Sequence, residues 1–215
     1  MDGLSAASLS APPLDRAALV GRPERCAVGL LGTLLVHASP EGTVAVRVDE
    51  VEAYGGVGED PGSHAHRGPR PSRATMFGEV GHLYVYFTYG MHWCANVVLH
   101  EQGAAGAVLL RGGEVVHGAA LAAMRRGGSR PRDLARGPAR LAQALGLDGR
   151  HDGADLCDVS SPLRLLRGTA PEDVAVGPRV GVAGEGAATP WRWWDATSRY
   201  VSAYRAAATR TRRRG

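Results

Sequence analysis

Hydrophobic and polar residues alternate along the first half of the chain with a period of two, which is typical of β-strands. Val44, Val46 and Val48 mark one face of such a strand over residues 43–54. Tyr89-Gly90-Met91 interrupts a later alternating region, which predicts the tip of a β-hairpin. In chain order, the predicted strands are 33–38, 43–54, 82–88, 92–99 and 105–111.

The second half of the chain shows helical patterns instead of alternation. An alanine-rich stretch over 114–126 has a helical period, and the glycine pair at 127–128 should end it. A second helix is predicted over 138–145, closed by Gly146. Shorter predicted elements are a helix over 22–31 and strands over 162–166 and 179–182. Antiparallel hairpins with separate helices predict an α+β fold.

Length and composition allow one globular domain. The chain has 215 residues, 44% hydrophobic and 21% charged, which suffices for a core and is too balanced for a disordered chain. No apolar run approaches the roughly 18 residues of a membrane-spanning helix, and the N-terminus has no signal-peptide pattern. We expect a cytoplasmic protein with a mobile tail over 1–16, one domain over 17–204 and an arginine-rich tail over 205–215.

The absence of lysine limits the chemistry that the chain can perform. All 25 basic residues are arginine, so no side-chain amine can form a Schiff base with a substrate. Cys26, Cys94 and Cys157 are widely spaced and match neither a disulfide framework nor a zinc site, which indicates a reducing compartment. His64 and His66 have no third ligand at a recognisable spacing, and we expect no metal.

Positive charge is concentrated in three places. The tail over 205–215 carries five arginines and no acid, so the net charge of +4 leaves the rest of the chain at −1. Residues 123–140 hold six arginines against a single acid, and a smaller cluster consists of Arg67, Arg70 and Arg73. Charge alone does not distinguish solvated loops from surfaces that bind nucleic acid.

Aromatic residues gather in the middle of the chain. Alternation puts Tyr84 and Tyr86 on one face of the predicted strand over 82–88, opposite an apolar face. Two such tyrosines suit either an amphipathic sheet face or a surface on which planar bases stack. Tyr89, at the predicted hairpin tip, has little core to enter, and aromatic wedges that insert between base steps come from such positions.

An acidic residue lies near the end of the valine-rich strand. Glu52 has the same parity as Val44, Val46 and Val48, which predicts that its carboxylate faces inward. A buried acid is costly unless it is paired or used in catalysis. Two roles follow: a structural ion pair, with Arg111 as a candidate partner, or a general base whose proton affinity is tuned by burial.

These residues lie within a longer pattern that resembles a known family. The segments that carry it are Val51-Glu52-Ala53-Tyr54, Glu59-Asp60-Pro61-Gly62-Ser63-His64, Met76-Phe77-Gly78, residues 81–97, Leu109-Leu110-Arg111, residues 136–141 and residues 179–182. In this order they resemble the alkyladenine (3-methyladenine) DNA glycosylase family over about residues 20–203. The resemblance implies a single mixed domain around a curved antiparallel sheet with a protruding β-hairpin, a fold shared with the C-terminal domain of formyltransferases.

The resemblance also implies an enzyme of base excision repair. It would be a monomer that flips alkylated or deaminated purines out of duplex DNA and hydrolyses the N-glycosidic bond, without metal or cofactor. Glu52 is similar to the general base that activates the attacking water, and Arg111 to the arginine near that water and the flipped nucleotide's phosphate. The missing lysines speak against an additional lyase activity.

Five further residues resemble the family's contacts to DNA. Tyr54 on one side, with His64 and Tyr86 on the other, would hold the flipped base between them. Tyr89 would be the wedge that fills the space left in the base stack. Asn96 would crowd the exocyclic amino group of guanine and so disfavour undamaged guanine.

Some alternatives stay open. The loop between Tyr54 and His64 is one residue longer than in some family members, so His66 is a second candidate for the stacking position. The tryptophans at 191, 193 and 194 could line the DNA surface or the core, with the core favoured. The competing function is a catalytically silent nucleic-acid-binding module in which Glu52 only forms an ion pair. A formyl-transfer domain is a weaker alternative, because no feature indicates a folate site.

Overall fold

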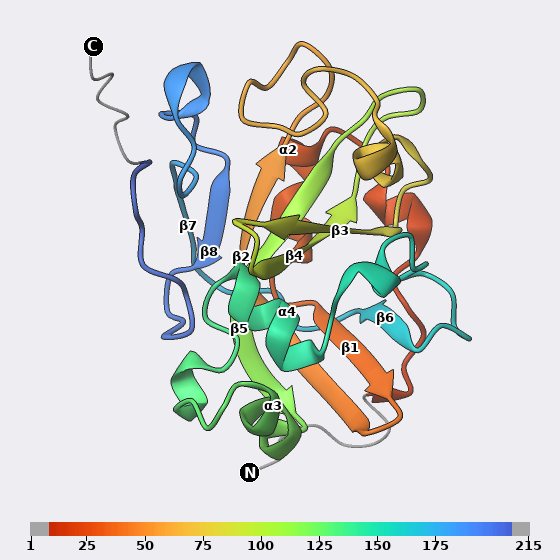
Figure 1. Cartoon of the computed structure of the whole chain (residues 1–215), viewed down its shortest axis with the longest axis vertical. Coiled ribbons are helices and arrows are strands. Elements are labelled where there is room, and N and C mark those ends of the chain that lie inside the picture. The colour runs from red at the N-terminus through yellow and green to blue at the C-terminus, as the bar shows by residue number, and fades with distance from the viewer. Residues whose placement is uncertain (1–8, 208–215) are drawn as a thin grey trace.

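An open, curved β-sheet forms the centre of the structure, a computed structural model that describes residues 9–207 (Figure 1). The strand order along its main path is β3-β4-β5-β2-β1-β6, and β8 pairs with both β2 and β7. These named strands all pair antiparallel. The strands are β1 (Leu34–Ser39), β2 (Gly42–Tyr54), β3 (Leu83–Thr88), β4 (His92–Val98), β5 (Ala107–His117), β6 (Leu163–Leu166), β7 (Val174–Gly177) and β8 (Arg192–Asp195).

Short helices accompany the sheet, which makes the fold α+β, as predicted. The longest described helix, α4, packs its apolar face on β4 and β5 and ends at Gly146, whose φ of 71° is the left-handed conformation of a helix cap. The α-helices are α2 (Pro23–Cys26), α3 (Ala119–Arg125) and α4 (Pro138–Leu145). The 3₁₀ helices are Arg16–Leu19, Ala27–Leu30, Pro71–Phe77, Pro131–Asp133, Gly149–His151 and Gly184–Gly186. No helix within residues 9–207 is long and apolar enough to span a membrane.

Most of the predicted elements are confirmed. The first four predicted strands correspond to β1 to β4 within one residue at each end, and α4 has the predicted bounds. In β3, Leu83 and Val85 enter the main core while Tyr84 and Tyr86 lie on the opposite face, as alternation requires. Trp191 and Trp193 pack against the main core, which confirms the favoured placement for these two rings.

Three predicted elements are wrong. The helix predicted over 114–126 is strand β5 up to His117, because its β-branched start pairs with β2, and α3 begins only after left-handed Gly118. The helix predicted over 22–31 is the single turn α2 followed by a 3₁₀ helix. The strand predicted over 179–182 is an irregular turn, and the strands of this region are β7 and β8.

A bulge in β2 decides where its acidic residues point. The pairing of β2 with β5 shifts register between Val48 and Glu50 and again between Glu50 and Val51. The core face therefore continues through Val51 and Ala53, not through Glu52. The prediction that Glu52 shares a face with the core valines is wrong, although its side chain is fully buried (0% exposed).

Both ends of the described chain are attached to the domain. Leu14, within the predicted tail over 1–16, is buried, and its backbone N–H donates to the Leu165 carbonyl at 2.7 Å. Arg16 forms an ion pair with Asp155 at 2.6 Å. At the other end, the carbonyl of Arg205 accepts from Gly181 N–H. Of the two predicted tails, residues 1–8 and 208–215 lie outside the described residues.

Candidate active site

A cavity of about 470 Å³ opens between the hairpin β3–β4, the loop that follows β2, the start of α4 and the turn at 180–183. Its walls combine aromatic rings with a few polar groups, as small-molecule sites commonly do. Six of the seven predicted site residues line it: Tyr54, His64, Tyr86, Tyr89, Asn96 and Arg111. The seventh, Glu52, is hydrogen-bonded directly to two of these residues, so the structure brings the whole predicted set together.

Three donors hold the Glu52 carboxylate. Val180 N–H donates to Oε1 at 2.6 Å, while the Tyr54 hydroxyl donates to Oε2 at 2.9 Å and Arg111 Nη1 to the same oxygen at 3.1 Å. A carboxylate offers about four acceptor positions, so one on Oε1 is left for a further donor. Burial raises the pKa of Glu52 and outweighs the opposing effects of Arg111, Val180 N–H and the Tyr54 hydroxyl.

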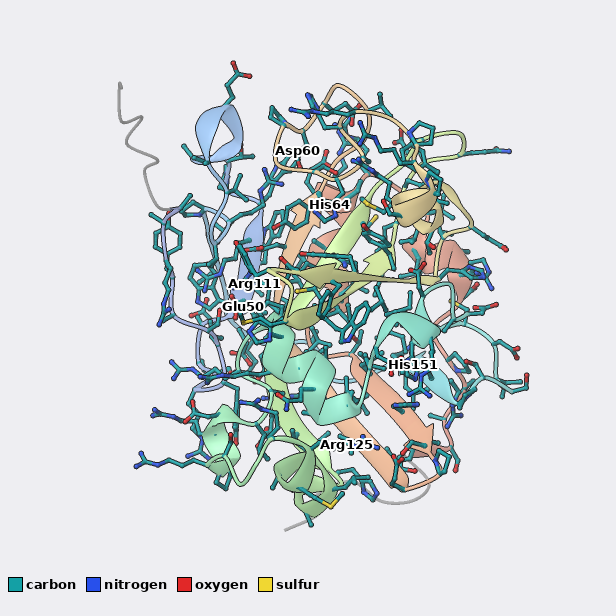
Figure 2. All side chains as sticks on the ribbon, viewed as in Figure 1. Glu50, Asp60, His64, Arg111, Arg125 and His151 are labelled. Atoms are coloured by element: carbon teal, nitrogen blue, oxygen red, sulfur yellow. The ribbon has the colours of Figure 1, made fainter. Side chains whose placement is uncertain are left out.

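Arg111 belongs to a buried network behind the cavity. Its Nε donates to Glu50 at 2.8 Å, its Nη1 to Glu52 and its Nη2 to the Ser202 hydroxyl at 3.2 Å. Figure 2 shows Glu50 and Arg111 next to each other, with His64 and Asp60 toward the loop that follows β2. Glu50 also accepts from Arg192 Nε at 2.7 Å. Burial opposes ionisation of Glu50, but Arg111 and Arg192 outweigh it and lower its pKa.

The Tyr54 ring is supported on the protein side by an arginine. The guanidinium carbon of Arg179 lies 4.8 Å from the Tyr54 ring centroid and 5.3 Å from that of Trp191. Arg179 is 1% exposed and forms a two-point ion pair with Asp60, with N–O distances of 2.5 and 2.8 Å. This pair joins the loop that carries His64 to the turn that carries Val180.

Three further rings, those of His64, Tyr84 and Tyr86, line the cavity together. His64 and Tyr86 are in edge contact, with centroids 4.5 Å apart, and Tyr84 stacks on Tyr86 at 5.6 Å. The Tyr84 hydroxyl lies 3.0 Å from His64 Nδ1. Partial burial and then the charge of Arg73 lower the pKa of His64, so its imidazole is neutral near pH 7. His66, the alternative stacking residue, does not line the cavity.

The remaining two predicted residues, Asn96 and Tyr89, both belong to the hairpin β3–β4 and line the cavity. Asn96 is buried on β4, and its Nδ2 donates to the Tyr84 carbonyl at 3.0 Å, which fixes the amide. Tyr89 is 86% exposed at the tip of the hairpin. Its φ of 52° makes it the single non-glycine residue with positive φ among residues 9–207. Such strain at an exposed aromatic residue is typical of a functional position.

Sequence reasoning missed several residues that complete the site. Glu50 and Ser202 bind Arg111, and Val180 binds Glu52 through its backbone. Asp60 and Arg179 lie within two segments of the family resemblance, 59–64 and 179–182, but no signal in the sequence pairs them. Across the described part of the chain, no cluster of three or more His, Cys, Asp or Glu side chains could hold a metal ion.

Sequence comparisons relate the chain to proteins named for one activity. The sequence profile of the methylpurine-DNA glycosylase family matches residues 18–199. A protein of Leifsonia xyli subsp. xyli, named for 3-methyladenine DNA glycosylase, is 55% identical over 183 residues, covering 82% of this chain and 85% of that protein. Relatives with the same name from Streptomyces avermitilis and Nocardia farcinica are 52% and 49% identical, covering 86% and 87% of this chain and 88% and 89% of their own.

Proposed function

The chain belongs to the methylpurine-DNA glycosylase family, and on this premise we propose that it flips alkylated or deaminated purines out of duplex DNA and hydrolyses their N-glycosidic bond. DNA glycosylases carry out this hydrolysis at the start of base excision repair. The observation that carries the proposal is a buried carboxylate of raised pKa, Glu52, held behind an aromatic-walled cavity by Tyr54 and Arg111. We expect the protein to act in the cytoplasm as a monomer.

The walls of the cavity suit a planar and positively charged base. Tyr54, His64 and Tyr86 all line the cavity, and we propose that Tyr54 stacks on one face of the base and the pair His64 and Tyr86 on the other. Ring faces attract cations, and alkylation at a purine ring nitrogen makes the base cationic. The neutral imidazole of His64 adds no repulsion. Asn96, whose amide is fixed on Tyr84, is proposed to exclude the exocyclic amino group of undamaged guanine.

Hydrolysis then requires one proton acceptor. Glu52 removes a proton from a water molecule while the water oxygen forms a bond to C1′ of the deoxyribose. The electron pair of the N-glycosidic bond passes to the purine, so a cationic alkylpurine leaves as a neutral base. Arg111 keeps the carboxylate in place from the other side. With no lysine in the chain, the product is an abasic site in an uncut strand.

The pH dependence of base release follows from the environment of Glu52. Only the ionised carboxylate accepts a proton, and burial raises its pKa above the ordinary glutamate value of 4.5. On a duplex containing 7-methylguanine, the single-turnover rate should therefore rise with pH through a midpoint above 4.5 and then level off. Rates measured between pH 4 and 9 test this, and a rate that is constant over the acidic range would contradict the role of Glu52.

The wedge and the pocket should respond differently to mutation. Tyr89→Ser removes one base–aromatic stack, worth about 1–3 kcal/mol, and should reduce flipping of every lesion by a similar factor of about 5 to 150. Tyr86→Ala removes a ring face that contacts the base, so it should slow release of cationic purines more than of neutral ones.

Fluorescence of ethenoadenine reports flipping, and release rates from 7-methylguanine and hypoxanthine report lesion preference. The wedge assignment fails if Tyr89→Ser changes lesion preference and leaves flipping intact.

A panel of duplexes identifies the substrate class. Each would carry 3-methyladenine, 7-methylguanine, hypoxanthine, ethenoadenine or a bulkier adduct, with undamaged guanine as the control. Release of alkylated purines with guanine retained would support the proposal. Tight binding of every duplex without release would favour a silent nucleic-acid-binding module instead.

A further inference from the structure

The last described segment of the chain crosses the back of the active site. Residues 198–205 have no regular secondary structure and follow strand β8. They are attached at several points: the Tyr200 hydroxyl donates to Glu114 at 2.7 Å, and Arg136 Nε donates to the Val201 carbonyl at 2.7 Å. In Figure 1 this segment runs outside β7 and β8, at the C-terminal end of the colour scale. We call residues 198–205 the C-terminal strap.

One residue of the strap commits all of its polar groups to the network around Arg111. The backbone N–H of Ser202 donates to Glu50 at 2.7 Å, and its carbonyl accepts from Arg192 Nη2 at 2.9 Å. Its hydroxyl donates to Glu50 at 2.9 Å and accepts from Arg111 Nη2 at 3.2 Å. The Ser202 hydroxyl therefore bridges Glu50 and Arg111, in addition to the direct bond between these two side chains.

The Arg111 guanidinium is thereby fixed at each of its nitrogens. Nε is held by Glu50, Nη1 by Glu52 and Nη2 by Ser202. A planar guanidinium that is held at three nitrogens cannot rotate within its plane without breaking a bond. Two of the three partners are fixed by the sheet on β2, and the third comes from the strap.

The strap also reaches the other side of Glu52. The carbonyl of Arg205 accepts from Gly181 N–H at 3.0 Å. Gly181 follows Val180, whose N–H donates to the Glu52 carboxylate. Arg111 and the 180–181 turn are the two partners of the Glu52 carboxylate that do not belong to β2. The strap contacts Arg111 through Ser202 and the turn through Arg205.

We propose that the C-terminal strap completes the active site and that Ser202 is a positioning residue, which orients Arg111 toward Glu52. The inference rests on the proposed glycosylase function. The match to the family profile ends at residue 199, before Ser202. Ser202 does not line the cavity, so its proposed action is through Arg111.

Ser202→Ala tests the proposal because it removes only the hydroxyl and leaves both backbone hydrogen bonds. We expect the single-turnover rate at saturating enzyme to fall about tenfold, as for loss of a hydrogen bond to a charged group, with affinity for lesion DNA unchanged. Arg111 holds the pKa of Glu52 down against burial, so a loosened Arg111 should move the acidic limb of the rate profile to higher pH. Ser202→Thr keeps the hydroxyl and should restore both rate and profile.

Ser160→Ala is the control. It makes the same change at an exposed serine outside the strap, whose hydroxyl donates to Asp158 at 2.8 and 2.9 Å, so it should leave the rate unchanged. A wild-type rate and pH profile for Ser202→Ala would overturn the inference, as would equal loss in the two alanine variants. If Ser202→Ala does not fold, Ser202→Cys is used instead, because a thiol is of similar size and forms only weak hydrogen bonds. The same two results for this variant would overturn the inference. A wild-type protein that releases no base would refute the proposed function itself.

Discussion

Replacement of Glu52 by glutamine is expected to reduce base release by about 10²–10⁴-fold while lesion binding is largely retained, because the proton acceptor is lost and the shape is kept. The measurement is the single-turnover rate on duplex DNA that contains 7-methylguanine, with binding followed separately. Val180 N–H donates to one carboxylate oxygen of Glu52, and Tyr54 and Arg111 donate to the other. The NH₂ group of a glutamine would have to face one of these sets of donors with its own N–H groups. The thermal midpoint of the variant is therefore measured as well.

Glu185→Gln provides the control, since Glu185 is exposed in the 3₁₀ helix at 184–186 beside the cavity turn. It should release base at the wild-type rate. A Glu52→Gln rate within about threefold of wild type would leave Glu52 as a structural ion-pair partner of Arg111 only.

The largest expected effect on stability comes from Asp60. Asp60→Asn leaves the Arg179 guanidinium, 1% exposed, without its counter-charge. Breaking a buried ion pair by removing one partner costs about 3–5 kcal/mol, and the free energy of unfolding should fall by that amount in urea titration at pH 7. Loss of activity should follow, because the pair connects the His64 loop to the turn that holds Glu52.

The effect should depend on pH in a defined direction. Burial opposes ionisation of Asp60, but hydrogen bonds and charge from Arg179 outweigh it and lower its pKa in the folded state. A lowered carboxyl pKa contributes stability above the unfolded-state value of 3.8, and this stability is lost as the pH falls through the folded-state pKa. The difference between wild type and Asp60→Asn should therefore shrink in acid.

An exposed ion pair gives the comparison for Asp60. Glu41 has a side chain that is 62% exposed and pairs with Arg125 at 2.7 Å. Glu41→Gln should lower the free energy of unfolding far less than Asp60→Asn, since surface ion pairs contribute little. Equal losses for Asp60→Asn and Glu41→Gln would mean that the buried pair does not hold the two loops together.

Local patterns predicted the parts of the fold in which neighbouring residues decide the structure. Alternation in β3 separates Tyr84 and Tyr86 from the core, and a glycine cap ends α4 at the expected residue. The same reasoning failed where pairing partners are distant. The alanine-rich region after Arg111 begins as strand because β2 lies beside it, and no local signal reports that neighbour.

The candidate site divides in a similar way. Glu52, Tyr54 and Arg111 were identified as an acid, an aromatic residue and a basic partner, and the structure joins them by hydrogen bonds. The parity argument for Glu52 failed because a bulge adds a residue to β2, which sequence alternation cannot register. The contacts of Ser202 could not be found from sequence, since they are with residues 91 and 152 positions away.

The proposed hydrolysis of the bond between a damaged purine and its sugar can be followed directly. Wild-type protein in excess is incubated with a duplex that carries one 7-methylguanine, and both products are followed in the same reaction by mass spectrometry. We expect free 7-methylguanine and, in equal amount, an uncut strand with an abasic site. Stable binding of the duplex with no free base, at any pH between 4 and 9, would contradict it.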